Sequence, residues 1–224
     1  MRRHFPATTV IPDSAIFLIA ALMVLLGLRA LAAAEAPAGG WIPLFDGKTL
    51  MGWKASENPA SFTIEDGCIV AHGPRAHLFS VGDVQGGDFK NFDLQAEVNA
   101  GKNSNSGIYF HTAYQEKDWP RQGFESQVNI THSDWIKTGS LYGVVNTGLA
   151  AAQDNKWWLQ EIIVEGRQVT VKVDGKIVVQ YTEPLGAQPN PDFTRKLGEG
   201  TFALQGHDPK SVIRYRNIRV KRPD

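Results

Sequence analysis

The sequence contains a single cysteine, Cys68, in 224 residues, and it has no excess of charge, with 23 Lys and Arg against 23 Asp and Glu. One thiol cannot close an internal disulfide, so the fold has to be held by an apolar core, which a chain of this length can supply. Cys68 lies between turn and strand signals and is predicted to be a buried thiol rather than a nucleophile. A balanced charge offers no positive surface for nucleic acid or anionic membranes, so a neutral ligand is expected.

Several motifs that mark common chemistries are also missing. The sequence has no glycine-rich phosphate loop, no Gly-x-Ser-x-Gly elbow, and no cysteine or histidine spacing typical of zinc. No segment beyond Leu31 sustains a helical apolar period for three turns. This absence disfavours helical bundles and folds that alternate strands with helices.

The N-terminus is the most apolar part of the chain. Arg2 and Arg3 precede a charge-free apolar run over residues 15–28, which is followed by small residues up to Ala34. This order is typical of a secretory signal peptide. Fourteen residues of helix span about 21 Å, less than the roughly 30 Å of a bilayer core, so cleavage after Ala34 is favoured over the alternative of an uncleaved membrane anchor. No stable membrane span is expected after cleavage.

We therefore predict a signal peptide over residues 1–34, a flexible lead over 35–40 and a single domain over 41–224. No cysteine stands directly after the apolar run at the processing site, so lipid attachment is not expected and the predicted location is periplasmic or secreted. Removal of the leader takes away three arginines and one aspartate, which leaves 20 basic and 22 acidic side chains. The oligomeric state is left open.

Short segments rich in β-branched and aromatic residues recur between turn residues through the predicted domain. Several of them alternate apolar and polar residues, which is the period of a half-buried strand. The clearest hairpin joins residues 169–173 to 177–181 through Asp174-Gly175, a dipeptide that supplies the positive φ angles of a tight turn. Many short strands without alternating helices predict an all-β fold, a two-sheet antiparallel β-sandwich or jelly roll.

Three of the predicted strands each place two hydrogen-bonding side chains at positions i and i+2, which share one face of a strand. These pairs are Tyr109 with His111, Glu125 with Gln127, and Gln205 with His207. If the three strands are neighbours, the six side chains form one polar patch on the face opposite the core.

A polar patch beside aromatic rings is what a sugar site requires. Sugar hydroxyls need paired donors and acceptors, and the C–H face of the ring needs a flat apolar surface. The tryptophans available for the second task are Trp119, Trp135, Trp157 and Trp158. The alternative is a solvated face, because outward residues of antiparallel strands are ordinarily polar.

The segment over residues 133–143 is a second source of ligand-binding groups. Lys137 and Tyr142 could donate to a ligand, and the alternative is a surface lysine with a half-buried tyrosine. His132 is interpreted as a loop residue. His207-Asp208 could contribute to a divalent cation site, although an aspartate after a strand is usually a turn former.

Six short motifs follow one another along the predicted domain. They are Trp41–Leu50 with Gly52-Trp53, Asn105–Phe110, Thr138–Gly143, Asp174-Gly175, Gly200–Asp208 and Tyr215–Arg219. In this order they resemble the 3-keto-disaccharide hydrolase domain family over about residues 41–222. The resemblance implies a concanavalin A-like sandwich related to laminarinase-type glucanases. It also implies action on glycosides whose C3 hydroxyl has been oxidised to a ketone.

The chain departs from the family pattern at two positions. Phe124 stands where the family often has tyrosine, and His111 stands where it often has arginine, which leaves the role of His111 open. The paired acids of laminarinase-type enzymes are absent, because Glu116-Lys-Asp118 is not followed by a third acid. Hydrolysis by two carboxylates is therefore disfavoured.

The resemblance implies instead that a base removes the C2 proton, which the C3 ketone acidifies, that the C1 substituent then leaves, and that water adds back. The candidate base is His207 or Glu125, and the candidates for stabilising the enolate are Lys137, Tyr142, His111 or a bound divalent cation. Substrate binding is assigned to Gln127, His111, Tyr109, Gln205 and Trp135. The alternative is a non-catalytic carbohydrate-binding module, which would use the same face without a titrating base.

Overall fold

The computed structural model describes Met1 and residues 40–82 and 87–223. The predicted signal peptide beyond Met1 and residues 35–39 of the predicted lead lie outside these residues, so export and a periplasmic or secreted location stay predictions. Contacts between the described residues from Gly40 onward group them into one unit. In the part of the chain that is described, no helix is long and apolar enough to cross a membrane.

The described residues form thirteen β-strands. They are β1 (Ile42–Pro43), β2 (Trp53–Ala55), β3 (Phe62–Glu65), β4 (Cys68–Ala71), β5 (Ala76–Ser80), β6 (Phe92–Ala100), β7 (Asn105–Thr112), β8 (Phe124–Asn129), β9 (Trp157–Glu165), β10 (Gln168–Val173), β11 (Lys176–Thr182), β12 (Thr201–Gly206) and β13 (Ile213–Lys221). A short 3₁₀ helix, η2 (Pro59–Ser61), lies between β2 and β3.

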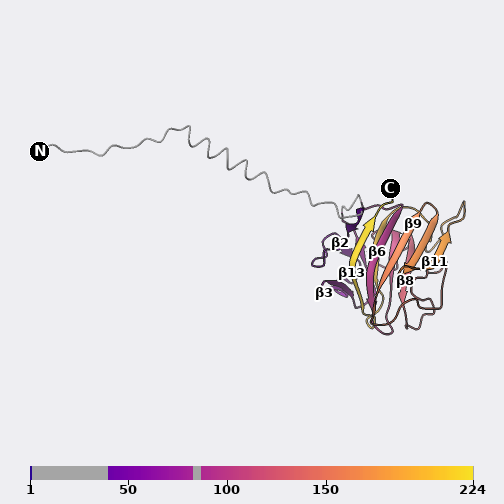
Figure 1. Ribbon diagram of the computed structural model, residues 1–224, viewed down its shortest axis with the longest axis horizontal. Helices are drawn as coiled ribbons and strands as arrows, with labels where there is room; N and C mark the ends of the chain where they lie inside the picture. Colours follow the sequence, from indigo (N-terminus) through magenta and orange to yellow (C-terminus); the bar gives the residue numbers. More distant parts are fainter. Residues whose placement is uncertain (2–39, 83–86, 224) are drawn as a thin grey trace. The chain divides into compact units, whose positions relative to one another are not determined.

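The strands make two sheets whose paired strands are antiparallel. The larger sheet has the order β11-β10-β9-β6-β13-β4-β3, with β1 paired to β13, and the smaller has the order β2-β5-β12-β7-β8. Figure 1 shows β13, β6 and β9 side by side in the larger sheet. The predicted all-β, two-sheet antiparallel sandwich is confirmed.

Local sequence pattern accounts for the three consecutive strands β9, β10 and β11 of the larger sheet. Along β9, buried residues alternate with exposed or half-buried ones, as a strand with one face on a core requires. The predicted hairpin is also confirmed, because β10 and β11 are joined at Asp174 and Gly175, whose φ angles are 48° and 75°. These positive angles fit the right-handed twist of the two strands.

The core lies between the two sheets and is rich in aromatic rings. The ring of Phe92 lies 5.8 Å from that of Phe110 and 4.9 Å from that of Phe202, so one side chain of the larger sheet contacts two of the smaller. Full burial of each such side chain contributes about 1.5–3 kcal/mol. Cys68 is buried as predicted, and burial raises the pKa of its thiol, which keeps it in the unreactive protonated form.

The face of the smaller sheet turned away from this core carries the polar side chains. Neighbouring strands place Tyr109 opposite Glu125 and, on its other side, opposite Ala203. Gln205 lies opposite His77 in the next pair. The strands β5, β12, β7 and β8 therefore present one continuous row of side chains on this outer face.

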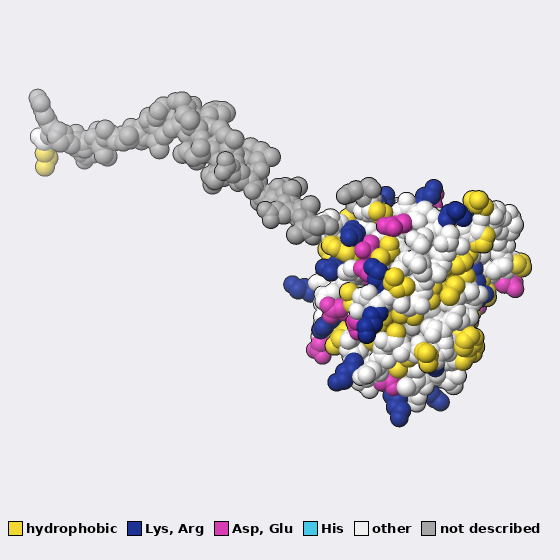
Figure 2. All heavy atoms as spheres, turned by 45° about the vertical axis from the view of Figure 1, so that its right-hand side comes forward, with side chains coloured by type: hydrophobic (Ala, Val, Ile, Leu, Met, Phe, Trp, Pro, Cys, Tyr) yellow, Lys and Arg dark blue, Asp and Glu magenta, His cyan; other side chains and the backbone are white. Residues whose placement is uncertain are grey.

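One face of the molecule carries both signs of charge without segregation. On the face shown in Figure 2, basic and acidic side chains are interspersed among apolar and uncharged ones. Such a surface creates no strong field of one sign. It agrees with the expectation of a neutral ligand, and the absence of a nucleic-acid partner stays a prediction.

Candidate functional site

A pocket of about 310 Å³ lies on the outer face of the five-stranded sheet. Strands β7, β8 and β12 supply its floor, and the segments after β7, β8, β11 and β12 supply its walls. The lining residues are Asn105, Tyr109, Trp119, Pro120, Gly123, Phe124, Glu125, Gln127, Asp134, Tyr142, Phe193, Arg195, Gln205 and His207. The pocket thus combines amides, two carboxylates, an imidazole and a guanidinium with several aromatic rings, as sugar sites do.

Glu125 occupies the floor of the pocket. Its Oε2 accepts a hydrogen bond from the Tyr109 hydroxyl at 2.9 Å, and its Oε1 accepts one from Gln205 Nε2 at 2.9 Å. The carboxylate lies over Gly107 on the neighbouring strand, where an added Cβ would stand 2.1 Å from Glu125 Oε1. The absence of a side chain at Gly107 is therefore what leaves room for the carboxylate in this position.

The electrostatic setting of Glu125 favours its protonated form more than water does. Burial raises the pKa of Glu125 to about 7, against the opposing hydrogen bonds from Tyr109 and Gln205 and the charge of Arg195. The side chain is half-buried, because it opens to the pocket and is enclosed by protein elsewhere. A carboxyl group with such a pKa can take up and release a proton near neutral pH.

Two amides continue the polar floor beside Glu125. With its nitrogen turned toward the carboxylate, Gln127 donates to Glu125 Oε1 at 3.2 Å and to the Ser106 carbonyl at 3.2 Å. In this orientation the Gln127 oxygen faces the side-chain amide of Asn105 at 3.0 Å, and the other end of the Asn105 amide lies 3.4 Å from His207 Nε2. The amides thus connect Glu125 to His207 through a chain of polar contacts.

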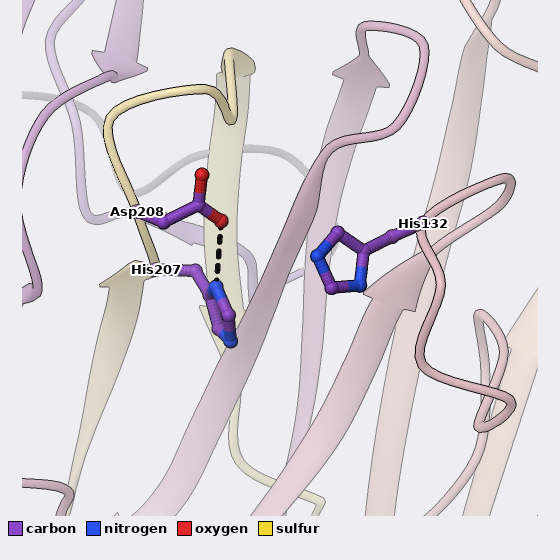
Figure 3. A group of neighbouring side chains, drawn as sticks. All are labelled: His132, His207 and Asp208. Atoms are coloured by element: carbon purple, nitrogen blue, oxygen red, sulfur yellow. Dashed lines mark hydrogen bonds and ion pairs between the residues drawn. The ribbon is translucent and has the colours of Figure 1, made fainter.

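His207 is oriented by the next residue in the chain. Its Nδ1 lies 2.7 Å from Asp208 Oδ2 (Figure 3), which leaves Nε2 to face Asn105. Burial works against ionisation of Asp208, but hydrogen bonds from His207 and Ser211 outweigh it and lower the pKa of Asp208 to about 2. The pair has the form of a histidine held by a half-buried carboxylate, as in many proton-transfer sites.

His132 joins this pair from the loop after β8. Figure 3 shows its ring facing His207 and Asp208, and the rings of the two histidines are 5.5 Å apart. Each of the three residues offers one ligand atom, and these atoms lie within 4.8 Å of one another. Imidazole and carboxylate ligands suit Zn²⁺ or Mn²⁺, so this trio could hold the divalent cation that the sequence suggested at His207-Asp208.

The opposite wall of the pocket carries a phenol and a guanidinium. The Tyr142 hydroxyl donates to Asp134 Oδ2 at 3.3 Å, and burial together with Asp134 raises the pKa of Tyr142. Arg195 lies 6.0 Å from the centre of the Tyr142 ring, and its guanidinium packs against Gly143, where a Cβ would stand 2.4 Å from Arg195 Cζ. Within the described part of the chain, Arg195 has no carboxylate within 4.0 Å, so its charge is available to a ligand.

The structure places most of the predicted residues around this pocket. Those that line it are Tyr109, Glu125, Gln127, Tyr142, Gln205 and His207. Sequence reasoning missed Asn105, Asp134 and Arg195, and it interpreted His132 as a loop residue. Asn105 stands two residues before Gly107 and four before Tyr109, so the two-residue period of the strand could have placed it on the same face. Arg195 lies in an irregular segment, where no such period predicts which way a side chain points.

His111 is a correction to the predicted face. Its φ is 53° and the pairing of β7 with β12 shifts register beside it, so its ring turns away from Tyr109 and contacts Phe92 and Phe110. Its Nε2 lies 3.0 Å from the Lys90 carbonyl, and its Nδ1 accepts from the Gly198 N–H. The structure therefore gives His111 contacts with the core and a loop rather than with the pocket.

Lys137 and Trp135 are also not brought to the pocket. The Lys137 ammonium donates to the carbonyls of His132 and Asp134, both at 2.7 Å, and so closes the loop that carries them. Trp135 is 61% exposed and lies outside the pocket lining. The expectation that these two side chains contact a ligand in this pocket is corrected accordingly.

Comparison with known proteins gives a match over nearly the whole described chain. The model of the 3-keto-alpha-glucoside-1,2-lyase-like domain matches residues 40–221. A protein of Bacteroides thetaiotaomicron named 3-keto-disaccharide hydrolase is 43% identical over 82 residues, which is 33% of this chain. The match spans only 28% of that relative's length.

Solved structures agree on the sandwich. A protein of Parabacteroides distasonis, provisionally named a glycosyl hydrolase, is 22% identical with a TM-score of 0.69, over 85% of this chain and 97% of its own. A Bacillus subtilis protein of unknown function with a galectin-like fold is 9% identical with a TM-score of 0.59, over 81% of this chain and 94% of its own. At these identities the likeness concerns the fold alone.

Proposed function

Because the chain belongs to the 3-keto-alpha-glucoside-1,2-lyase-like domain family, we propose that it cleaves 3-keto-glycosides in the pocket around Glu125. The observation that carries the proposal is the setting of the Glu125 carboxylate. It lies over Gly107, accepts hydrogen bonds from Tyr109 and Gln205, and has a pKa raised to about 7. A general base for neutral pH needs such a pKa and such a fixed position.

The proposed reaction begins with removal of the C2 proton. The C3 ketone acidifies this proton, because the electron pair left at C2 delocalises into an enolate. Glu125 takes the proton, the enolate electrons form the C1–C2 double bond, and the C1–O bond breaks so that the leaving oxygen departs with a proton from an acid. Addition of water to the resulting unsaturated ketone completes a net hydrolysis.

The other pocket residues supply the remaining roles in this proposal. Arg195 and Tyr142, on the wall opposite Glu125, would donate to the oxygen on which enolate charge develops. His207, oriented by Asp208, would give the proton to the leaving oxygen. Trp119 and Phe193 offer apolar surface to the sugar ring. This assignment places the base on Glu125 rather than on His207.

The first test is turnover by the purified protein. We expect release of 4-nitrophenol from 4-nitrophenyl 3-keto-glucoside, and none from the unoxidised glucoside, because only the ketone acidifies C2. Absorbance of the phenol at neutral pH gives the rate, and loss of the 3-keto absorbance gives the fate of the sugar. Binding of the 3-keto-glycoside without turnover would contradict the proposal and support the non-catalytic carbohydrate-binding alternative.

The rate is expected to rise with pH up to neutrality. Glu125 acts as a base only when ionised, and its pKa is raised to about 7, so kcat/KM should fall about tenfold for each pH unit below 7. Above pH 7 the same carboxylate is ionised and its contribution levels off. Initial rates at constant ionic strength from pH 5 to 9 measure the profile. A rate that stays flat down to pH 5 would exclude a base with this raised pKa.

A divalent cation is the second way in which His207 could contribute. Asp208 already accepts hydrogen bonds from His207, Ser211 and the Lys210 N–H, which favours the role of a proton-transferring pair. The trio with His132 nevertheless has the donor set of a cation site. Dialysis against EDTA, followed by addition of Mn²⁺ or Zn²⁺, separates the two roles, since only a cation site loses and regains turnover.

A further inference from the structure

His77 lies beside the pocket and takes no part in the reaction described above. It stands on β5 directly opposite Gln205 on β12, and on the same outer face of the sheet. Its ring is fully buried, with the ring of Tyr109 at 5.4 Å and that of Trp119 at 5.5 Å, both edge to face. Trp119 also lines the pocket, so this indole separates His77 from the open space of the site.

Among the described residues, three buried polar atoms of this facing pair have no hydrogen-bond partner. They are both ring nitrogens of His77 and the side-chain oxygen of Gln205. Buried polar atoms are ordinarily paired, and each one left unpaired lowers stability and calls for an explanation. One explanation is a group that enters from outside, because the unpaired atoms come from two facing residues and include both acceptor and donor capacity.

Trp119, which covers His77, is held in place by residues on its solvent-facing side. The Arg75 guanidinium lies 5.3 Å from the Trp119 ring and pairs with Asp118 at 3.1 Å and with Glu57 at 2.9 Å. The Asp118 side chain is half exposed and its φ is 67°, an unfavourable backbone angle for a residue other than glycine. The Asp118 pair is exposed and contributes little, whereas the two hydrogen bonds from Arg75 to the half-buried Glu57 hold the guanidinium in place. The Trp119 ring itself is held by contacts with the side chains of Arg75, His77 and His207, which a ligand can replace.

We propose that the ligand-binding surface extends beneath Trp119, where His77 and Gln205 bind hydroxyl groups of a second sugar unit once the indole has moved aside. The inference rests on the proposed function in that it takes the ligand to be a 3-keto-glycoside. A hydroxyl both donates and accepts, so it can pair at once with an imidazole nitrogen and with the Gln205 oxygen. Burial lowers the pKa of His77 to about 3, so its ring is neutral at pH 7 and offers one donor and one acceptor.

The spacing of the strands indicates which sugar unit reaches His77. Strand β12 lies between β5 and β7, so His77 and Gly107 are separated by two strand spacings, about 9.5 Å. The carboxylate of Glu125 lies over Gly107. This separation exceeds the width of one hexose ring. The sugar whose C2 faces Glu125 is therefore too small to reach His77, and the second sugar unit, bonded to the first, contacts His77 instead.

His77→Phe tests the inference, because phenylalanine keeps a planar ring and removes both unpaired nitrogens. We expect its melting temperature to rise above that of the wild type. At the same time, KM for a 3-keto-disaccharide should rise at least about tenfold, the effect of losing one to two hydrogen bonds to a ligand. KM for 4-nitrophenyl 3-keto-glucoside, which lacks the second sugar, should change by less than about twofold. If KM for the disaccharide stayed unchanged in His77→Phe, the imidazole would have only a packing role, and the inference would be wrong.

Two further variants keep the test decisive. His77→Asn retains a donor and an acceptor and is expected to recover part of the disaccharide affinity, which also serves if His77→Phe fails to fold. His72→Ala changes an exposed histidine outside the pocket and should leave both KM values unchanged. If the wild type turns over neither substrate, the proposed function fails. Calorimetric binding of the 3-keto-disaccharide to wild type and His77→Phe then decides the inference separately, since equal affinities or no binding would overturn it.

Discussion

Glu125→Gln is expected to lower kcat for 3-keto-glycoside cleavage about 10²–10⁴-fold, the range over which a positioned base contributes to a rate. Glutamine has nearly the same shape, so the space over Gly107 remains filled. Its amide cannot accept the C2 proton, and one of the two groups that donate to Glu125, the Tyr109 hydroxyl or the Gln205 amide, then faces a second donor. The loss should therefore fall mainly on kcat, with a smaller change in KM.

The comparison that makes this result specific is Glu165→Gln. Glu165 is an exposed residue at the end of β9 in the other sheet, so its substitution should leave kcat and the melting temperature unchanged. The residual activity of Glu125→Gln should also lose the rise between pH 5 and 7, because the group that titrates there is gone. If Glu125→Gln kept the wild-type kcat, Glu125 would not be the base, and His207 would be the next candidate to test.

The sequence was sufficient to predict that the polar side chains of the pocket floor lie together, because their positions follow from the two-residue period of a strand. Glu125 with Gln127, and Gln205 with His207, share faces by spacing alone. Neighbouring strands then bring the pairs together, since β7 lies between β8 and β12. The sandwich itself follows from the same alternation, repeated through many short strands without helices.

The residues that sequence reasoning misplaced lie where this period is interrupted. His111 follows Tyr109 by two positions, yet a register shift between β7 and β12 and a positive φ turn its ring toward Phe92. Lys137 lies in a loop, and loop carbonyls rather than a ligand use its ammonium. A bulge or an irregular loop depends on contacts far away in the sequence, so a local pattern cannot report it.

Arg195 and His77 show two further limits. Arg195 lies in the irregular segment between β11 and β12, and it reaches the pocket only because Gly143 leaves space for its guanidinium. The sequence predicts His77 to be an ordinary strand residue. Its unpaired ring nitrogens and its contact with the Trp119 ring become visible only in the structure. Both facts are properties of packing across the chain, which composition and spacing do not contain.

Gly107→Ala is expected to lower kcat/KM about 10²-fold or more while the fold remains intact. The new Cβ would stand 2.1 Å from Glu125 Oε1, 2.6 Å from Cγ and 2.7 Å from Cδ. The glutamate side chain is flexible and opens to the pocket, so it can swing away, and the backbone has no reason to move. Gly107 also lies outside the set of glycines with positive φ, so alanine fits its strand conformation. A displacement of about 1 Å in a reacting group is enough for such a loss.

The matched control is Gly198→Ala, since a Cβ at Gly198 meets nothing within 4 Å and its φ is also outside the positive region. Its kcat/KM and melting temperature should equal those of the wild type. The double variant Gly107→Ala with Glu125→Gln then identifies the cause of the loss. If Gly107 acts through the position of Glu125, the second substitution adds almost nothing to the first, because two changes that remove one interaction are not additive. A further loss of the full size seen for Glu125→Gln alone would mean that the carboxylate still works beside the alanine, and that the place over Gly107 is not where it acts.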